Sequence, residues 1–334
     1  MQDWQPGASQ AVRQLRAQLY KQIRDFFAAR KVLEVDTPIL SLAASTDPML
    51  DHWQSKQYYV LPLKGGQNRA SGYNDTQHDY YLQTSPEFAM KRLLASGSGS
   101  IYQICRCFRA GESGRRHNPE FVMLEWYRVD FQLIQLIEEV VDLLQLWWPQ
   151  RQVQLYDYRE LLLDRTGLDY EQASVADIQA YLSASATQYS TELLQGQRDD
   201  LYDLVFSNEI EPSLGIDSIA VLTNYPVSQA QYSQLNLDGS SAQRFEVYLN
   251  GVELANGYQE LRDGAEQAQR FAQHNAQREV LLKPQIKIDH RLLAALDHGL
   301  PACSGVALGI DRLLMLVARK GHIDEIVEFA LDRS

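Results

Sequence analysis

The sequence predicts an α+β fold in which a mainly antiparallel β-sheet is flanked by helices. Two hairpin patterns predict the sheet, one over residues 101–128 and one over residues 244–261. Apolar residues at helical spacing lie outside these hairpins and predict the flanking helices. With 334 residues, the chain is long enough for a sizeable core in one large domain or two small ones.

A helix and a short strand are predicted near the N-terminus. Ser9 is a suitable N-cap, and the apolar residues after it recur at helical spacing: Val12, Leu15, Leu19, Ile23 and Phe26. Residues 32–38 (VLEVDTP) follow as a strand that stops at proline. A surface helix packed on a core would explain this pattern equally well.

Residues 80–90 (YYLQTSPEFAM) predict a strand that runs into a helix. Proline is favoured in the first turn of a helix, so Pro86 marks the junction. Ser85 and Glu87 therefore flank the start of this helix.

The first hairpin joins residues 101–109 to residues 121–128 around a basic loop, and its cationic or titratable side chains are Arg109, Arg115, Arg116 and His117. Alternation divides the second strand into one face with Phe121, Met123, Glu125 and Tyr127 and another with Val122, Leu124 and Trp126. An aromatic ring, a carboxylate and a phenol in a row suit a ligand better than a core. An ordinary hairpin with a solvated basic loop is the alternative.

The middle of the chain carries fewer motifs. Residues 131–148 predict an apolar-rich helix, and three acidic residues in it argue against a membrane span: Glu138, Glu139 and Asp142. Residues 150–212 are expected to form a helical insertion with helices at 177–182 and 201–210. Residues 64–74 are expected to form a flexible loop.

The second hairpin turns at residues 250–251, where Asn-Gly is the strongest short signal for a type I′ turn. Pairing outward from this turn sets Tyr248 against Glu253 and Glu246 against Ala255. Glu246 and Glu253 then share one face, within roughly 7–8 Å by Cα geometry. Mg²⁺ bound to phosphates usually takes one or two protein carboxylates, so it would offset their repulsion. A solvated pair of surface glutamates is the alternative.

A register shift is expected further along this second strand. In a regular strand, Asn256, Tyr258 and Glu260 would point to one face, whereas Glu253, an odd number of residues away, would point to the other. If all four face one ligand, a bulge must lie between them, at Gly257 or at the step from residue 255 to 256.

Residues 305–316 (GVALGIDRLLML) predict a glycine-punctuated strand that opens into an apolar helix. Gly305 and Gly309 allow a ligand to approach the backbone closely. This pattern by itself is common in proteins.

Together these segments resemble the three motifs of class II aminoacyl-tRNA synthetases. The helix, strand and proline up to residue 38 resemble motif 1, the dimer interface, while residues 108–128 resemble motif 2 and residues 305–316 resemble motif 3. RRHNPEFVMLEWYR is similar to the lysyl-tRNA synthetase subgroup. The resemblance implies the class II catalytic fold as a single domain over residues 1–334, the insertion at about 150–212 included, and a homodimer.

The resemblance also implies ATP as substrate and Mg²⁺ as cofactor. Arg109 would hold the α-phosphate, Phe121 would stack on adenine, and Arg312 would hold the γ-phosphate; a guanidinium fork suits phosphate oxygens. Glu246 and Glu253 would bind the metal, and Arg109, Arg312 and Glu253 would be catalytic. The nucleotide site as a whole would comprise Arg109, Gly111, Glu112, His117, Asn118, Phe121, Glu246, Glu253, Leu254, Gly309 and Arg312.

The lysine pocket that the resemblance implies would consist of Ser85, Glu87, Glu125, Tyr127, Asn256, Tyr258, Glu260 and Ala307. Each of its glutamates alone is more often a surface residue than a pocket residue. Together they offer three carboxylates to a substrate with two ammonium groups. The substrate carboxylate is ionised at neutral pH, so it can attack the α-phosphate without a base and form an aminoacyl-adenylate. A nucleophile then displaces AMP.

The acceptor is predicted to be a protein. The first motif begins close to Met1, so no anticodon-binding domain is expected before it. The net charge is −12, and the dense basic patch lies in the loop assigned to ATP. Because nucleic-acid binding favours basic surfaces, tRNA is not the expected acceptor. A lysyl-synthetase core of this length resembles the ligases that attach (R)-β-lysine to the ε-amine of a lysine of elongation factor P. Ala307, where lysyl-tRNA synthetases commonly have glycine, favours β-lysine. No residue is identified as the base that the amine requires.

One departure and two rival interpretations remain. The family places a glutamate two residues after Arg109, where this chain has Gly111 and then Glu112. The rivals are a truncated paralogue that uses α-lysine to charge tRNA or to make an amide, and a non-catalytic regulatory subunit. The odd set of Cys105, Cys107 and Cys303, without a signal peptide, predicts reduced thiols in the cytoplasm.

Overall fold

An eight-stranded sheet forms the centre of the computed structural model, which describes residues 4–57 and 78–333. Its strands, in spatial order, are β1 (Leu33–Glu34), β5 (Ile101–Phe108), β6 (Glu120–Val129), β11 (Cys303–Gly309), β10 (Val252–Gln259), β9 (Ala242–Leu249), β8 (Ser218–Tyr225) and β7 (Gln152–Asp157). The inner pairs are antiparallel, whereas the pairs at the two edges, β1–β5 and β7–β8, are parallel. The predicted mainly antiparallel α+β fold is confirmed. The loop predicted at 64–74 lies outside the described residues.

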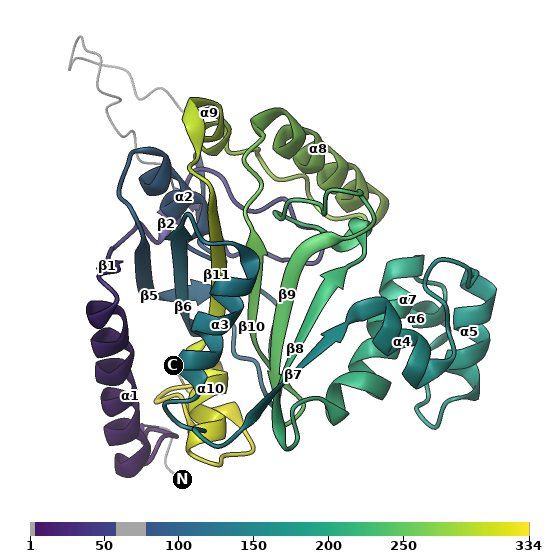
Figure 1. The fold of residues 1–334 in the computed structure, drawn as a ribbon, viewed down its shortest axis with the longest axis horizontal. Coiled ribbons are helices and arrows are strands. Elements are labelled where there is room, and N and C mark those ends of the chain that lie inside the picture. The colour runs from purple at the N-terminus through teal and green to yellow at the C-terminus, as the bar shows by residue number, and fades with distance from the viewer. Residues whose placement is uncertain (1–3, 58–77, 334) are drawn as a thin grey trace.

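Three helices cover one face of this sheet: α1 (Gln10–Ala29), α3 (Leu133–Leu144) and α10 (Ile310–Val317). Figure 1 shows α3 in front of the sheet and α1 along the edge formed by β1. Ser9 caps α1, because its Oγ accepts from the backbone N of Val12 at 3.3 Å, as predicted. The buried residues of the three helices form one hydrophobic cluster with the sheet residues Val122, Leu124 and Trp126.

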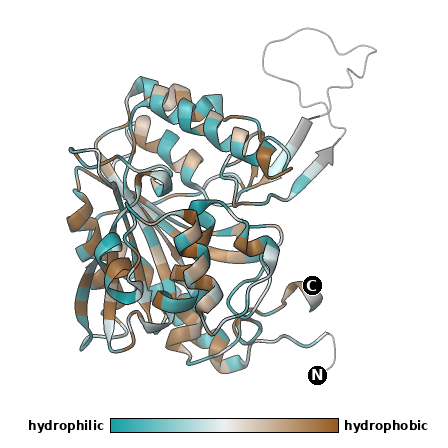
Figure 2. Ribbon diagram, turned by 90° about the vertical axis from the view of Figure 1, so that its right-hand side faces the viewer, coloured by the Kyte–Doolittle hydropathy of each residue, from teal (hydrophilic) through white to brown (hydrophobic). Residues whose placement is uncertain are grey.

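A smaller sheet and three more helices lie on the opposite face. The sheet contains β2 (Leu40–Ser41), β4 (His78–Leu82) and β3 (Gln54–Gln57), with β4 in the middle. The helices are α2 (Glu87–Ala95), α8 (Gly264–Val280) and α9 (His290–Gly299), and α2 begins directly after Pro86 as predicted. The long helix at the top of Figure 2, α8, is mainly hydrophilic in colour. This layer and the central sheet enclose the candidate site between them.

Residues near the two chain ends lie in the lower half of both views (Figures 1 and 2) and contact each other. The backbone N of Gly7 donates to the carbonyl of Glu328 at 2.7 Å. Short 3-10 helical turns lie between the other elements and near the C-terminus, at Glu211–Ser213, Val227–Gln229, Ile323–Glu325 and Leu331–Arg333.

The segment predicted to be a helical insertion begins with a strand, which corrects that prediction. β7 pairs in parallel with β8 at the sheet edge, and most of its side chains are exposed, the alternating apolar residues Val153 and Leu155 included. The helices that follow are α4 (Tyr158–Thr166), α5 (Val175–Ala184), α6 (Thr191–Leu194) and α7 (Arg198–Val205), with a π-helical turn at Phe206–Ile210. They share a second hydrophobic cluster and form the right-hand lobe of Figure 1.

The second hairpin has the predicted turn and a different register beyond it. Asn250 and Gly251 have φ of 51° and 65°, as a type I′ turn requires. The register shifts between Glu253 and Ala255, so Glu246 pairs with Asn256, and the predictions of a Glu246–Ala255 pair and of a bulge after residue 255 are wrong.

Close packing explains why Gly257 is not the bulge. A Cβ at Gly257 would lie 2.5 Å from the Phe245 ring and 2.9 Å from the carbonyl of Gly305. This glycine therefore makes room for a neighbouring ring within regular pairing.

No helix along residues 4–57 and 78–333 combines the length and the apolar character needed to cross a bilayer. The apolar-rich helix predicted at 131–148 is α3, and one of its acidic residues is part of the interior. Buried Glu139 lies 3.5 Å from Arg30 and 3.3 Å from Arg128, and it accepts from Trp126 Nε1 at 3.1 Å. These partners offset the cost of burying the carboxylate.

Candidate active site

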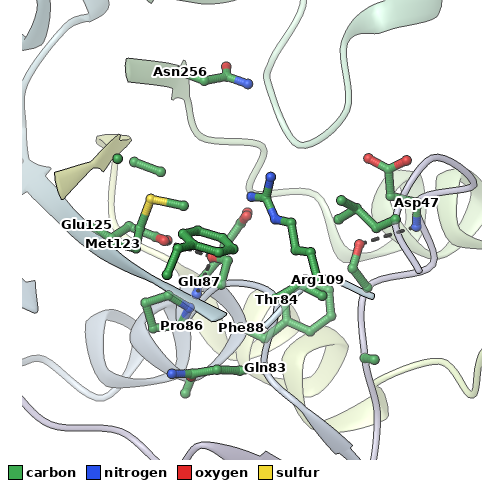
Figure 3. A pocket seen from close by; sticks show the side chains of 18 of the residues that line it. Asp47, Gln83, Thr84, Pro86, Glu87, Phe88, Arg109, Met123, Glu125 and Asn256 are labelled. Atoms are coloured by element: carbon green, nitrogen blue, oxygen red, sulfur yellow. Dashed lines mark hydrogen bonds between the residues drawn. The ribbon is translucent and has the colours of Figure 1, made fainter. Parts of the chain in front are cut away.

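A cavity of about 510 Å³ lies over strands β6, β10 and β11 and beside α2. All but two of the residues predicted for the site line it: Ser85, Glu87, Arg109, Glu112, His117, Asn118, Phe121, Glu125, Tyr127, Glu253, Leu254, Asn256, Tyr258, Glu260, Ala307, Gly309 and Arg312. In Figure 3, Arg109, Glu87 and Glu125 point into the same space, with Asn256 across from them. Gly111 and Glu246 are outside this lining.

The two faces of β6 separate as predicted. Phe121, Met123, Glu125 and Tyr127 line the cavity, whereas Leu124 and Trp126 belong to the core alone and Val122 belongs to the core but also borders the cavity. Regular pairing of β6 with β5 on one side and β11 on the other keeps this alternation intact.

An arginine and an aromatic ring lie together at one end of the cavity. The guanidinium carbon of Arg109 is 5.1 Å from the centre of the Phe121 ring, which fits a cation–π contact. Arg109 Nη1 lies 3.6 Å from Glu112 Oε1. Gly111 between them has a φ of 80° and open space where a Cβ would be, so the chain turns there. The carboxylate expected at residue 111 therefore reaches Arg109 from Glu112.

A second arginine enters the same region from the first turn of α10. Arg312 Nη1 donates to the Glu253 carbonyl at 3.0 Å and to Glu253 Oε2 at 3.1 Å, and Nη2 contacts His117 Nε2. Burial lowers the pKa of His117, and the positive charge of Arg312 lowers it further. A neutral imidazole can accept from the guanidinium. Arg312 is therefore held toward the cavity from two sides.

Asp311, which sequence reasoning missed, fixes α10 against β6. Its carboxylate accepts from the backbone N of Val122 at 2.7 Å and from Arg16 Nη2 at 2.7 Å. One carboxylate thus ties together the three segments that resemble synthetase motifs, and it places Arg312 relative to Phe121. An aspartate in the first turn of a helix is common, so the local pattern carried no sign of these distant partners.

Three carboxylates define the other end of the cavity, the buried Glu125 and Glu260 and the half-buried Glu87. Glu125 accepts from Ser85 Oγ at 2.8 Å and from the Tyr127 hydroxyl. Burial raises the pKa of Glu125 to about 8, and the nearby charge of Glu87 contributes to the rise. Burial likewise raises the pKa of Glu260 to about 7, against the opposing effect of Lys91.

Gly305 makes room for this carboxylate cluster. A Cβ at residue 305 would lie closer than 3.0 Å to both Glu260 Oε1 and the ring of Tyr127. The predicted close approach at Gly305 therefore involves two pocket side chains.

Only one of the two carboxylates predicted to bind the metal faces the cavity. Glu253 lines the cavity, whereas buried Glu246 accepts from Arg244 Nη2 and from the Tyr248 hydroxyl. Burial raises the pKa of the nearby Glu211 carboxyl to about 7, and the charges of Glu253 and Glu246 add to the rise. Among the described residues, no group of three or more His, Cys, Asp or Glu side chains is arranged to hold a metal ion. A single accessible carboxylate still fits Mg²⁺ that takes its other ligands from phosphate and water.

Further residues in the cavity lining or directly behind it escaped the sequence prediction. Gln231 lines the cavity and accepts from the Tyr258 hydroxyl, and Arg244 Nε donates to Asn256 Oδ1 at 3.2 Å. Lys91 lies behind two of the carboxylates. Only Lys91 had a visible signal, because it follows Glu87 by four residues on a predicted helix.

The fold and the site define a class II synthetase catalytic domain, and the chain belongs to the family of class II tRNA synthetases (D, K and N), whose model matches residues 3–333. Relatives named elongation factor P–(R)-β-lysine ligase match over nearly their whole length. The relative from Edwardsiella ictaluri is 44% identical, over 100% of this chain and 99% of its own. Those from Vibrio parahaemolyticus (45%; 98% of both chains) and Mannheimia succiniciproducens (42%; 99% of this chain and 98% of its own) carry the same name.

Proposed function

We propose that this protein is an ATP-dependent ligase that activates (R)-β-lysine as an aminoacyl-adenylate and transfers it to the ε-amine of a lysine of elongation factor P. The main support for the proposal is that a single cavity contains both a group of cations suited to phosphates and a group of carboxylates suited to a diamino acid. Arg109 and Arg312 supply cations for phosphates, and Glu87, Glu125 and Glu260 supply anions for a diamino acid. The name shared by the full-length relatives supports the substrate and the acceptor.

In the activation step, a carboxylate oxygen of the amino acid bonds to the α-phosphorus of ATP, and the bond from that phosphorus to the pyrophosphate oxygen breaks. The attacking carboxylate is already ionised at neutral pH, so the protein contributes position and charge. Arg109 is proposed to neutralise the α-phosphate and Arg312 the γ-phosphate, while Phe121 stacks on the adenine. His117 and Glu253 keep Arg312 oriented.

Mg²⁺ is typical of this family, and Glu253 is the residue proposed to bind it directly. When bound, the ion would neutralise phosphate charge. Glu246 is proposed to act on the ion through its negative charge and not as a direct ligand, because its two oxygens already accept hydrogen bonds from Arg244 and Tyr248.

Recognition of the amino acid is assigned to the three carboxylates, helped by Ser85, Tyr127, Asn256, Tyr258 and Ala307. Two ammonium groups bound near Glu125 would favour its ionised form, so substrate binding should release a proton. The methyl group of Ala307 lies in the wall of the cavity, where it narrows the space relative to glycine. Such a methyl group changes discrimination by about 1–3 kcal/mol, enough to favour one position of the amino group over another.

The second step is aminolysis. The unprotonated ε-amine of the acceptor lysine attacks the carbonyl carbon of the adenylate, its extra proton passes to solvent or to a base, and AMP leaves with the bonding electrons. The acceptor is proposed to be elongation factor P in the cytoplasm, and not tRNA.

A homodimer through the motif 1 segment is also proposed. Two apolar side chains of this segment and the strand after it, Leu33 and Leu40, are 56% and 54% exposed. Analytical ultracentrifugation tests this part of the proposal: a monomer at micromolar concentration would contradict it.

The activity is tested by ATP–pyrophosphate exchange with (R)-β-lysine and with α-lysine. Two product assays follow, a mass measurement on elongation factor P and aminoacylation of tRNA. We expect exchange to prefer (R)-β-lysine and elongation factor P to gain one β-lysyl group. A preference for α-lysine with charging of tRNA would favour a synthetase paralogue, and no exchange with either amino acid would favour a regulatory subunit.

A further inference from the structure

A buried lysine lies between two carboxylates of the amino-acid pocket. The Nζ of Lys91, on α2, is 2.6 Å from Glu87 Oε1 and 2.6 Å from Glu260 Oε2. The side chain of Lys91 is 2% exposed, and it is not part of the cavity lining. It therefore contacts the pocket carboxylates from behind and leaves the cavity free.

The ammonium group of Lys91 stays charged in this position. Burial alone would lower its pKa, but the negative charges of Glu260 and Glu87 outweigh burial and raise the pKa above its ordinary value. The ring of Tyr232 adds a cation–π contact, with its centre 5.2 Å from Nζ. Two anions and a π face thus surround a single buried cation.

This cation sets the charge that the pocket presents to its ligand. Glu87, Glu125 and Glu260 carry three negative charges when all are ionised, and Lys91 offsets one of them. Two charges remain, which equals the number of ammonium groups on a diamino acid. Glu125 already binds a proton near neutral pH in the empty pocket, and without Lys91 the stronger repulsion among the three carboxylates would draw in a further proton.

We propose that Lys91 is a positioning residue, a fixed internal cation that holds Glu87 and Glu260 in place and matches the charge of the pocket to a diammonium substrate. The inference rests on the proposed function, since it concerns the pocket assigned to the amino acid. The competing explanation is an ion pair that only ties α2 to the sheet. The two explanations differ in what they predict for substrate binding.

The test compares Lys91→Met with wild type and with Lys21→Met in the pyrophosphate exchange assay. Lys21 is a matched control, because it also pairs with a carboxylate four residues away, at 2.6 Å from Asp25, but on the exposed side of α1. We expect Lys91→Met to raise the KM for β-lysine by at least about tenfold at pH 7.5 while the KM for ATP changes less than about twofold. Lys21→Met should match wild type.

A pH profile separates positioning from a structural role. Lys91 opposes the rise in the pKa of Glu260, so in Lys91→Met that pKa should be higher, and the fall of the amino-acid KM with rising pH should move to higher pH. Lys91→Arg keeps the charge and should restore most of the affinity and the wild-type profile. An amino-acid KM near the wild-type value in folded Lys91→Met, or a loss confined to kcat and thermal stability, would overturn the proposal.

If Lys91→Met does not fold, the double variant Glu87→Gln/Lys91→Met leaves one fewer unpaired charge and is compared with Glu87→Gln alone. A further rise in the amino-acid KM supports the proposal, because Glu260 has lost its partner, and equal values refute it. Absence of exchange in the wild type would instead refute the proposed function, and this inference with it.

Discussion

Replacing Gly305 by alanine tests the geometry of the amino-acid pocket with a single methyl group. The new Cβ would lie closer than 3.0 Å to both Glu260 Oε1 and the Tyr127 ring, whereas ordinary contacts begin near 3.4 Å. Neither neighbour can move easily, since both are buried and Glu260 is paired with Lys91. Overpacking of this kind costs about 1–3 kcal/mol.

If this cost appears in substrate binding, the KM for the amino acid rises about 5- to 150-fold, at about 1.4 kcal/mol for each factor of ten. ATP–pyrophosphate exchange at varied β-lysine and varied ATP measures the effect, and the KM for ATP should stay within about twofold. Gly321→Ala is the control, because no atom lies within 4 Å of a Cβ at that glycine. An unchanged amino-acid KM in Gly305→Ala would refute the placement of Glu260 in the pocket.

Three other predictions follow from the same contacts. Arg109→Ala should abolish exchange with every amino acid, since the α-phosphate would lose its cation. Asp311→Asn should destabilise the protein by about 1.5–3 kcal/mol, because its carboxylate binds both Arg16 and the backbone of Val122, and thermal unfolding measures the loss. Because the pKa of Glu125 is raised to about 8, β-lysine binding near pH 7 should release a proton, and Glu125→Gln should lose that release.

Each of these predictions has a result that contradicts it. Normal exchange by Arg109→Ala would remove the ATP assignment. Wild-type melting of Asp311→Asn would mean that this carboxylate does not tie α10 to β6. Calorimetry of β-lysine binding in two buffers with different ionisation enthalpies reports the proton, and equal heats would mean that Glu125 is already ionised in the empty pocket.

The raised pKa of Glu125 also sets the direction of its effect on stability. Its folded pKa lies above the value for an unfolded chain, so between roughly pH 4 and pH 8 the folded state binds more protons. The contribution of Glu125 to stability therefore decreases as pH rises through this window. Substrate ammonium groups would reverse that loss, and the stabilisation by β-lysine should be larger at pH 8 than at pH 6.

Short-range patterns predicted the elements that local chemistry controls. Ser9 caps α1, Pro86 precedes α2, and the Asn250-Gly251 turn has the expected positive φ values. These features need only a few neighbouring residues, so the chain reveals them directly. Strict alternation in β6 also separated its cavity face from its core face, because pairing on both sides prevents a slip.

The register of the second hairpin illustrates where such reasoning fails. Glycine suggested a bulge at residue 257, but Gly257 packs against Phe245 and Gly305, which come from two neighbouring strands. The shift falls between Glu253 and Ala255 instead. Strand β7 was also missed, although residues 152–155 alternate polar and apolar; its apolar residues Val153 and Leu155 are exposed and do not belong to the core.

The sequence by itself determined the class of fold, its family motifs and a set of site residues of which nearly all line the cavity, because these depend on residue types at short spacing. Only the tertiary structure decided how those side chains are held. Lys91 bridges Glu87 on its own helix and Glu260 directly after β10, and Asp311 joins Arg16 to β6. Partners that lie up to 295 residues apart in the chain meet only when the sheet forms. Charge balance inside the pocket is therefore a property of the folded protein.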